Sequence, residues 1–240
     1  NYVKRCVGTP GDSLAVIDGY VHINGTRLKL SDRAKPMYDY EIYAKNGVSS
    51  RLLEEVDASD YLRTYISGAL NQSQYNALAP YVLGANRTPD GKIELLADED
   101  GIPIDVIRQL RLSLTEEKPR SRIANMTDEM VAKLRENSTI DSVVKTEEPK
   151  GMYAGAFPQK PNLYPWNNDN FGPIYIPEAG ATVDINYKTI PLYKKIIRDY
   201  EHNDVKVSGQ KVFINGKEAN SYTFKQDYYW MMGDNRDHSE

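Results

Sequence analysis

The sequence predicts a mainly β fold with an α/β insertion, in which a β-rich region is built from both chain ends. Near the amino terminus, short apolar runs alternate with the pairs Asp18-Gly19 and Asn24-Gly25, which favour hairpins because a type I′ turn needs two positive φ angles. A similar pattern returns at 207–216, and helical periodicity occurs only between these two segments. The 18 tyrosines, against 4 phenylalanines, favour half-buried strand surfaces.

Residues 1–30 are predicted to form a β-meander. Its strands are expected at 2–7, 13–17 and 20–23, with a turn over 8–12. The segment 207–216 echoes 16–25, and each copy ends in Asn-Gly. Two explanations stay open: the limited chemistry of turns makes hairpins alike, or the segment is a true duplication.

Between residues 31 and 150 the pattern changes to that of an α/β insertion. The apolar spacing predicts a helix over 57–71 with Asp57 or Ser59 as its N-cap. Thr127 is expected to cap a second helix over 128–136, whose first turn is acidic. Candidate strands lie at 38–44, 93–97, 110–114 and 142–145.

Residues 146–173 are rich in Pro, Gly and Asn, which predicts an extended linker or a loop held by Trp166 and Phe171. Strand sequence returns at 172–177 and 181–187, and a third helix is expected over 192–200. We therefore expect a β-rich core from 1–30 and 172–240, an α/β insertion at 31–150 and a linker at 151–171.

The composition excludes several classes of function. A net charge of -4 gives no broad basic surface, so nucleic acid is a poor candidate partner. Cys6 is the single cysteine, so no intramolecular disulfide forms. The histidines at 22, 202 and 238 lack metal-ligand spacing, and no Gly-rich phosphate loop occurs, so neither a metal nor a cofactor is expected. No apolar run is long enough to cross a bilayer, and nothing specifies an oligomeric state.

The first chemically specific segment surrounds Lys4. In a strand, Lys4 shares a face with Tyr2 and Cys6, whereas Arg5 faces the other way. Desolvation between poorly polar neighbours lowers the pKa of a lysine toward values at which its neutral amine acts as a base. The alternative is an edge-strand lysine in solvent, where it discourages aggregation.

The second segment is a dense polar run that follows Trp230. It comprises Gly233, Asp234, Asn235, Arg236, Asp237, His238 and Ser239. Such a run predicts a structured loop whose side chains hydrogen-bond one another or the backbone. The oxygen donors would also suit a cation, but the spacing lacks the Gly and the distal Glu of an EF-hand loop.

Together the two segments resemble the signature motifs of type I signal peptidases. The first match consists of Lys4, Arg5, Gly8, Pro10, Gly11 and Asp12; the second consists of Gly233, Asp234, Asn235 and Arg236, with Ser239 after two further residues. The resemblance implies that Lys4 is the general base of a Ser/Lys dyad and that the Ser239 hydroxyl orients its amine. It implies that residues 233–237, including Asp237, build the supporting loop, within a signal-peptidase-like β-barrel or sandwich.

The resemblance also implies an activity and a location. Type I signal peptidases are serine endopeptidases that remove signal peptides from exported preproteins at the cell inner membrane, with the catalytic region on the periplasmic side. The expected partners are therefore preprotein signal peptides and the membrane, the latter through an anchor outside this chain. The chain itself is expected to be a soluble fragment that needs no cofactor.

The match departs from the family at the nucleophile. In the family the serine precedes the lysine motif, in a Ser-Met-x-Pro-Thr type sequence, whereas Ser13, Ser31, Ser121 and Ser208 all lack the Met and Pro. Residues 1–240 alone are therefore predicted to be inactive. The sequence before Asn1 would distinguish the peptidase from a binding module, because an apolar anchor followed by such a serine motif indicates the peptidase.

Two alternatives stay open. One is another Ser/Lys protease, such as a self-cleaving repressor-type peptidase, against which the Gly-Asp-Asn-Arg loop argues. The other is a non-catalytic β-rich module whose Tyr-rich faces bind a peptide or a protein.

Overall fold

The computed structural model describes residues 3–238 and divides the chain into two compact units. One unit comprises Asn1–Lys35 together with Glu147–Glu240, and the other comprises Pro36–Thr146. Strands account for 32% of the structure and helices for 17%, and the strand pairs of residues 3–238 are antiparallel. The mainly β class predicted from the sequence is therefore confirmed.

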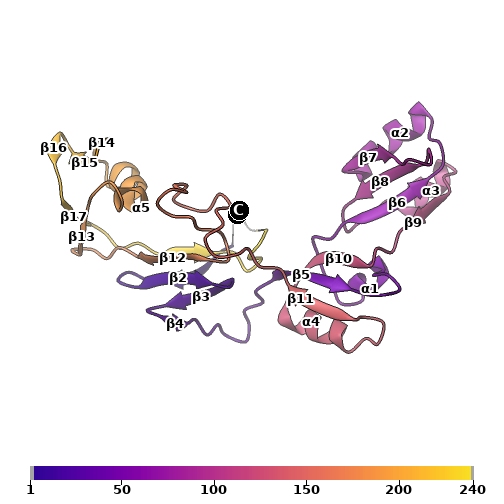
Figure 1. The fold of residues 1–240 in the computed structure, drawn as a ribbon, viewed down its shortest axis with the longest axis horizontal. Coiled ribbons are helices and arrows are strands. Elements are labelled where there is room, and N and C mark those ends of the chain that lie inside the picture. The colour runs from indigo at the N-terminus through magenta and orange to yellow at the C-terminus, as the bar shows by residue number, and fades with distance from the viewer. Residues whose placement is uncertain (1–2, 239–240) are drawn as a thin grey trace. The chain divides into compact units, whose positions relative to one another are not determined.

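The unit formed from both chain ends contains four small sheets, and Figure 1 shows the largest of them with β12, β2, β3 and β4 side by side. The other three pair β1 with β18, β13 with β17, and β14 with β15 and β16. Its elements are β1 (Arg5–Gly8), β2 (Ser13–Ile17), β3 (Tyr20–Ile23), β4 (Thr26–Arg27), β12 (Phe171–Tyr175), β13 (Thr182–Asp184), α5 (Ile190–Lys195), the π-helical turn η2 (Ile196–Tyr200), β14 (Val205–Ser208), β15 (Lys211–Ile214), β16 (Lys217–Glu218), β17 (Ser221–Thr223) and β18 (Trp230–Met232).

The two Asn-Gly turns of this unit have the same construction. Asn24 and Asn215 both adopt a φ of 51°, and the following glycines have φ values of 80° and 79°. The side-chain Oδ1 of Asn24 accepts from the backbone N–H of Ser13, and that of Asn215 accepts from Asp204, each over 2.9 Å. The two segments are therefore similar in structure as well as in sequence. Limited turn chemistry and duplication would both produce this similarity.

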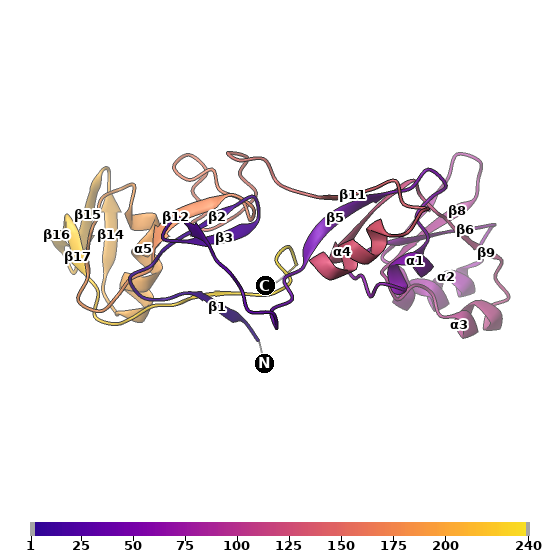
Figure 2. The same cartoon turned by 90° about the horizontal axis from the view of Figure 1, so that it is seen from below.

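Two apolar clusters form the core of this unit. One gathers Val7, Leu14, Val16, Val21, Phe171, Ile174 and Ile176 from β1, β2, β3 and β12 and the residue after it. The other joins α5 and η2 to β14 and β15, which lie beside the helix in Figure 2; its members include Ile190, Tyr193, Ile197, Val205, Val212 and Phe224. The helix predicted over 192–200 is present, but it begins at Ile190 and ends in a π-helical turn.

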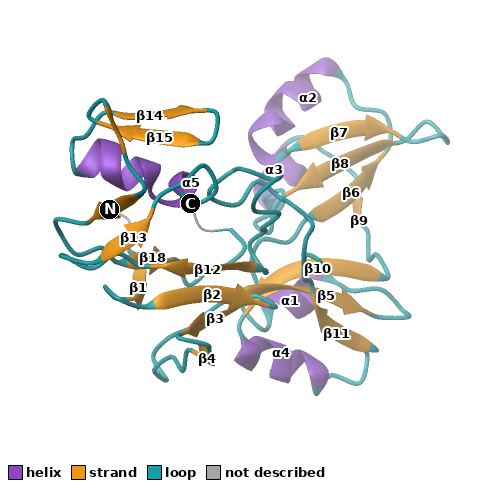
Figure 3. Ribbon diagram, turned by 60° about the vertical axis from the view of Figure 1, so that its left-hand side comes forward, coloured by secondary structure: helices purple, strands orange, loops and turns teal. Residues whose placement is uncertain are grey.

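The inserted unit contains a three-stranded sheet, β10-β5-β11, and a four-stranded sheet, β7-β8-β6-β9. Helix α4 packs against β10 and β11 (Figure 3), and α2 and α3 pack with the four-stranded sheet around Tyr65, Leu78, Ile93 and Leu95. Its elements are β5 (Tyr38–Tyr43), α1 (Ser50–Glu54), β6 (Arg63–Ser67), α2 (Gln72–Leu78), the 3-10 turn η1 (Ala79–Tyr81), β7 (Gly84–Arg87), β8 (Ile93–Ala97), α3 (Ile104–Gln109), β9 (Leu114–Glu116), β10 (Ser121–Met126), α4 (Asp128–Arg135) and β11 (Ser142–Lys145).

The helix predicted over 57–71 is wrong. Asp57 and Asp60 adopt positive φ angles of 59° and 54°, which no α-helix tolerates, and Arg63–Ser67 forms strand β6 instead. Tyr65 and Ser67 are the buried residues of that strand and are two positions apart. Burial in this segment therefore repeats every two residues, as in a strand, and not every 3.6 residues, as in a helix. Asn71 caps the next helix, α2, through a capping box with Gln74.

The strand predicted over 110–114 is also wrong. Leu110 is the C-cap of α3, and Arg111 has a φ of 52°, so the strand β9 begins only at Leu114. The other insertion elements are confirmed to within a residue: the three strands at β5, β8 and β11, and the helix α4 with Thr127 as its N-cap. At the amino terminus the first strand is Arg5–Gly8, and Tyr2 lies outside the described residues.

The barrel expected as one form of the β-rich region is not formed by the described strands. Residues 3–238 contain six separate sheets of two to four strands, and none of them closes. The strands are short, and the register breaks between Cys6 and Gly8 and between Phe171 and Ile174. Within the described chain, no helix has both the length and the apolarity that a bilayer-spanning segment needs.

Candidate functional site

The two motifs meet through one strand pair. Strand β1 runs antiparallel to β18, with Arg5 opposite Met232, Cys6 opposite Met231 and Gly8 opposite Trp230. The lysine motif from one end of the chain therefore lies beside the start of the polar loop from the other end. Cys6 is an exposed free thiol on this pair.

Gly8 allows strand β1 to lie against the core. A Cβ atom at this position would overlap Cδ1 of Ile176 and would lie 3.3 Å from Cδ1 of Leu14. A side chain here would force the end of the Ile176 side chain out of its place in the cluster that contains Leu14 and Ile176. The glycine of the motif thus has a packing role in holding β1 in place.

The turn after β1 is held by the Asp12 carboxylate. Its Oδ2 accepts from the backbone N–H and the hydroxyl of Thr9, each over 2.8 Å, and its Oδ1 accepts from Nδ2 of Asn24 over 2.9 Å. These hydrogen bonds, that from the Thr9 backbone first, lower the pKa of Asp12. Gly11, with a φ of 88°, donates its N–H to the carbonyl of Ile176. Pro10, Gly11 and Asp12 therefore fix how β1 passes into β2.

Arg5 joins the first motif to the second. Its Nε lies 2.8 Å from Oδ1 of Asp234 and its Nη2 lies 2.6 Å from Oδ2, a two-pronged ion pair. The hydrogen bonds from Arg5 lower the pKa of Asp234, and a hydrogen bond with the backbone of Lys35 contributes in the same direction. The pair fixes the beginning of the polar loop relative to β1.

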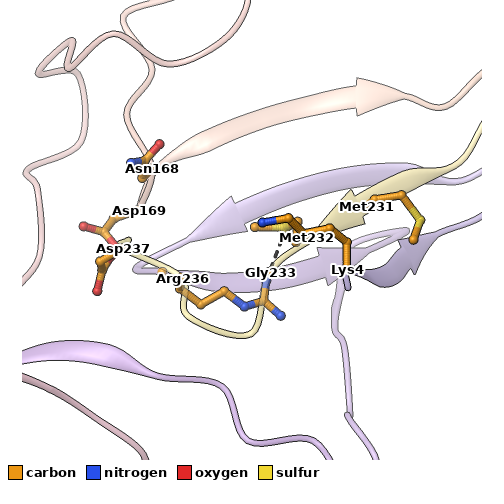
Figure 4. Close-up of a pocket in the computed structure, with 9 residues that line it drawn as sticks. Lys4, Asn168, Asp169, Met231, Met232, Gly233, Arg236 and Asp237 are labelled. Atoms are coloured by element: carbon orange, nitrogen blue, oxygen red, sulfur yellow. Dashed lines mark hydrogen bonds between the residues drawn. The ribbon is translucent and has the colours of Figure 1, made fainter. Parts of the chain in front are cut away.

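Lys4, immediately before β1, lines a cavity of about 290 Å³. Residues from both motifs and from two other segments form its wall: Gly19, Asn168, Asp169, Met231, Met232, Gly233, Arg236 and Asp237. Figure 4 shows the Lys4 side chain extending past Met232 toward the loop, with Asn168, Asp169 and Asp237 on the opposite side. Lys4 as a whole residue is half-buried.

The polar loop has internal hydrogen bonds. Oδ1 of Asn235 accepts from the backbone N–H of His238 over 3.1 Å, and Nη1 of Arg236 lies 3.2 Å from the sulfur of Met232. Gly233 is buried and Asp237 is half-buried, whereas His238 is exposed. Ser239, predicted to orient the Lys4 amine, lies outside the described residues.

Part of the cavity wall comes from the segment 151–171, which the sequence predicts to be a linker. Asn168 and Asp169 line the cavity, and Asp169 is only 5% exposed. The fully buried amide of Asn167 fixes this turn: its Nδ2 donates to the carbonyls of Pro149 and Met152, and its Oδ1 accepts from the N–H groups of Asp169 and Asn170. The run of Asn and Asp residues at Asn167–Asn170 is the feature of the sequence that indicates this turn, because Asn and Asp side chains hydrogen-bond to nearby backbone in turns.

The arrangement suits proton transfer at the Lys4 amine. A lysine acts as a general base when a cavity holds its amine near the group that it deprotonates. No serine is among the described residues that line the cavity. Within residues 3–238, no cluster of three or more His, Cys, Asp and Glu side chains is placed to hold a metal ion.

In comparisons with known proteins, no family model, no curated protein and no solved structure matches this chain. The site must therefore be interpreted from its own residues.

Proposed function

We propose that this chain is the membrane-external region of a type I signal peptidase, a serine endopeptidase that removes signal peptides from exported preproteins. The observation that carries the proposal is the β1–β18 pair, which brings Lys4 and the Gly233–Asp237 loop to one cavity. Motifs this far apart in the sequence have no local reason to meet. Their meeting around an amine is the arrangement that a Ser/Lys dyad requires.

In the proposed chemistry, this chain supplies the general base, Lys4, and the loop that positions it. A serine hydroxyl attacks the carbonyl of a small residue that precedes the scissile bond, and the neutral amine of Lys4 takes the hydroxyl proton. The lysine ammonium then protonates the leaving amine as the peptide bond breaks. Water hydrolyses the resulting serine ester, again with Lys4 as the base. The nucleophile is a serine outside residues 1–240, so these residues alone cleave nothing.

Met232 and the loop supply the positioning that a lysine needs. A four-carbon side chain has many rotamers, and a fixed amine position requires packing along its length. Met231 and Met232 line the cavity beside Lys4, and the Arg5–Asp234 pair fixes the loop that forms the other part of its wall. Arg5 and Asp234 are thus proposed as positioning residues.

The test is the replacement of Lys4 by Ala in the polypeptide that includes the segment upstream of Asn1. Cleavage of a preprotein with small residues before the scissile bond is expected to fall by about a hundredfold to ten-thousandfold, the usual contribution of a general base. Lys4→Arg is expected to fail as well, because guanidinium does not deprotonate near neutral pH. Lys206→Ala, at an exposed lysine paired with Asp204, is the matched control and should cleave normally.

Cleavage of the same preprotein by Lys4→Ala at the unaltered rate would refute the proposal. Thermal unfolding of both variants separates a chemical effect from misfolding. If the full polypeptide binds peptides but never cleaves them, the β-rich peptide- or protein-binding module takes the place of the peptidase.

A further inference from the structure

A second cavity of about 250 Å³ lies in the same unit and is predominantly aromatic. Its wall includes Phe157, Tyr193, Tyr200, Tyr228, Tyr229 and Trp230, together with aliphatic side chains from β12, α5 and η2. Lys195 is the one charged side chain among the described residues that line it. A cavity of about 150 Å³ holds a benzene-sized group, so this one has room for a large apolar side chain.

The aromatic cavity has a fixed wall. The Tyr228 hydroxyl donates to the carboxylate of the buried Glu201 over 3.2 Å, and its backbone N–H donates to the carbonyl of Pro177. Glu201 also accepts from the Tyr222 hydroxyl over 2.5 Å and from the backbone N–H of Lys225 over 2.9 Å. A ring held in this way needs little ordering when a ligand arrives, which favours affinity.

The rim of the cavity exposes large aromatic side chains. Tyr229 is 58% exposed, Tyr200 is 55% exposed and Phe157 is 38% exposed. Single exposed apolar residues are ordinary, but several around one cavity indicate an interaction surface. The Tyr228 and Tyr200 rings also contact each other, with centroids 6.4 Å apart.

The aromatic cavity continues from the Lys4 cavity along one stretch of chain. Residues 228–230 line the aromatic cavity, and residues 231–233 line the Lys4 cavity. The centres of these two triplets are three residues apart, which is about 10 Å in a strand that rises roughly 3.3 Å per residue. An extended peptide lying along this stretch therefore spans both cavities with three residue steps.

We propose that the aromatic cavity binds a large apolar side chain, such as Leu or Phe, at the fourth residue before the cleaved bond. The proposal rests on the function proposed above. If the peptide residue just before the cleaved bond lies at Lys4, the residue three positions earlier in the peptide lies at the aromatic cavity. That residue is the fourth before the cleaved bond. Signal peptides have small residues next to the cleavage site and an apolar region on its amino-terminal side, so this position is where that region can begin.

Paired peptides test the assignment by their binding to residues 1–240. One peptide carries Leu at the fourth position before the small-residue site and the other carries Ser. The Leu peptide is expected to bind about tenfold to a hundredfold more tightly, the range for burying one such side chain. Moving the Leu two residues further from the site should remove the gain.

The variant Tyr229→Ser is expected to remove most of this preference, because an exposed ring that covers the bound side chain is lost. Val207→Ser, at a residue of β14 that is 44% exposed, is the matched control and should keep the preference. The proposal is overturned if the unaltered protein binds the Leu and Ser peptides with equal affinity. It is also overturned if Tyr229→Ser weakens the binding of both peptides by the same factor. Thermal unfolding shows whether each variant remains folded.

The two proposals fail in different ways. If Tyr229→Ser removes the Leu preference but Lys4→Ala cleaves normally, the aromatic cavity binds the peptide and the peptidase function is wrong. If Lys4→Ala stops cleavage but the peptides bind alike, the peptidase stands and the cavity assignment is wrong. Lys4→Ala should leave the Leu preference unchanged, since Lys4 does not line the aromatic cavity.

Discussion

Arg5 and Asp234, 229 positions apart in the sequence, form a two-pronged ion pair. The guanidinium fork matches the geometry of a carboxylate, so the pair fixes direction as well as distance. A single residue at each end of the chain thereby sets the register of the polar loop against strand β1. Lys4 is the neighbour of one member and Gly233 is the neighbour of the other.

Asp234→Asn is expected to destabilise the unit by about 1 kcal/mol, the upper range for pairs that remain partly in solvent. The Arg5 hydrogen bonds place the folded pKa of Asp234 below its usual value. The stabilisation is therefore complete above the unfolded pKa, near 4, and is lost as pH falls through the folded pKa. Urea unfolding of both proteins between pH 6 and pH 2 measures this, and the difference should shrink toward acid. A constant difference across that range would contradict the assignment.

Asn24→Ala and Asn215→Ala are expected to cost similar amounts, about 1 to 3 kcal/mol each. Both changes remove an amide that bridges a turn and leave Ala in a left-handed conformation. Asn162→Ala, at an exposed asparagine, serves as control and should stay within about 0.5 kcal/mol of the parent. Denaturant midpoints give the comparison, and a negligible effect at either turn would show that the two are not equivalent.

Glu201→Gln is expected to destabilise by about 2 kcal/mol, because the new amide offers one acceptor where the carboxylate takes three donors. Glu218→Gln, at an exposed glutamate paired with Lys211, should cost less than about 1 kcal/mol. Unfolding in urea measures both. Equal costs would mean that the Glu201 cluster contributes nothing specific to the wall of the aromatic cavity.

Stability is expected to fall in alkali through two tyrosines. Burial raises the pKa of Tyr193 to about 12, and burial with the Glu201 hydrogen bond raises the pKa of Tyr222. A raised folded pKa gives stability that is complete below the unfolded pKa, near 10, and is lost as pH rises toward 12. Tyr193→Phe should flatten this loss. Ultraviolet absorbance of phenolate follows the titration, and an ordinary pKa for Tyr193 would contradict its burial.

The sequence predicted those parts of the fold that depend on local chemistry. The hairpin turn at Asn24, the helix after Thr127 and the strand β8 each carry their signal within a few residues. The failures arose where backbone conformation overrode apolar spacing. Asp57 and Asp60 adopt left-handed conformations that their neighbours do not specify, so the apolar spacing predicts a helix where a half-buried strand forms.

The candidate site was predictable in its parts but not in its assembly. Lys4 and the 233–237 loop were identified from their motifs, and their meeting depends on a strand pair between distant segments. The Asn168–Asp169 wall was missed because a turn built on the buried Asn167 amide resembles a polar linker in composition. The aromatic cavity was missed because its tyrosines come from several separate elements.

The division of one unit between the two chain ends has a consequence for synthesis on the ribosome. The inserted unit, Pro36–Thr146, is continuous and can fold while translation goes on. Strand β1 emerges before its partner β18, which is made about 225 residues later, a delay of roughly 10 to 50 seconds at 5 to 20 residues per second. Until then Lys4 has no cavity. The site is thus completed only after β18 has left the ribosome, and a nascent chain that stops before Trp230 carries the lysine without its surroundings.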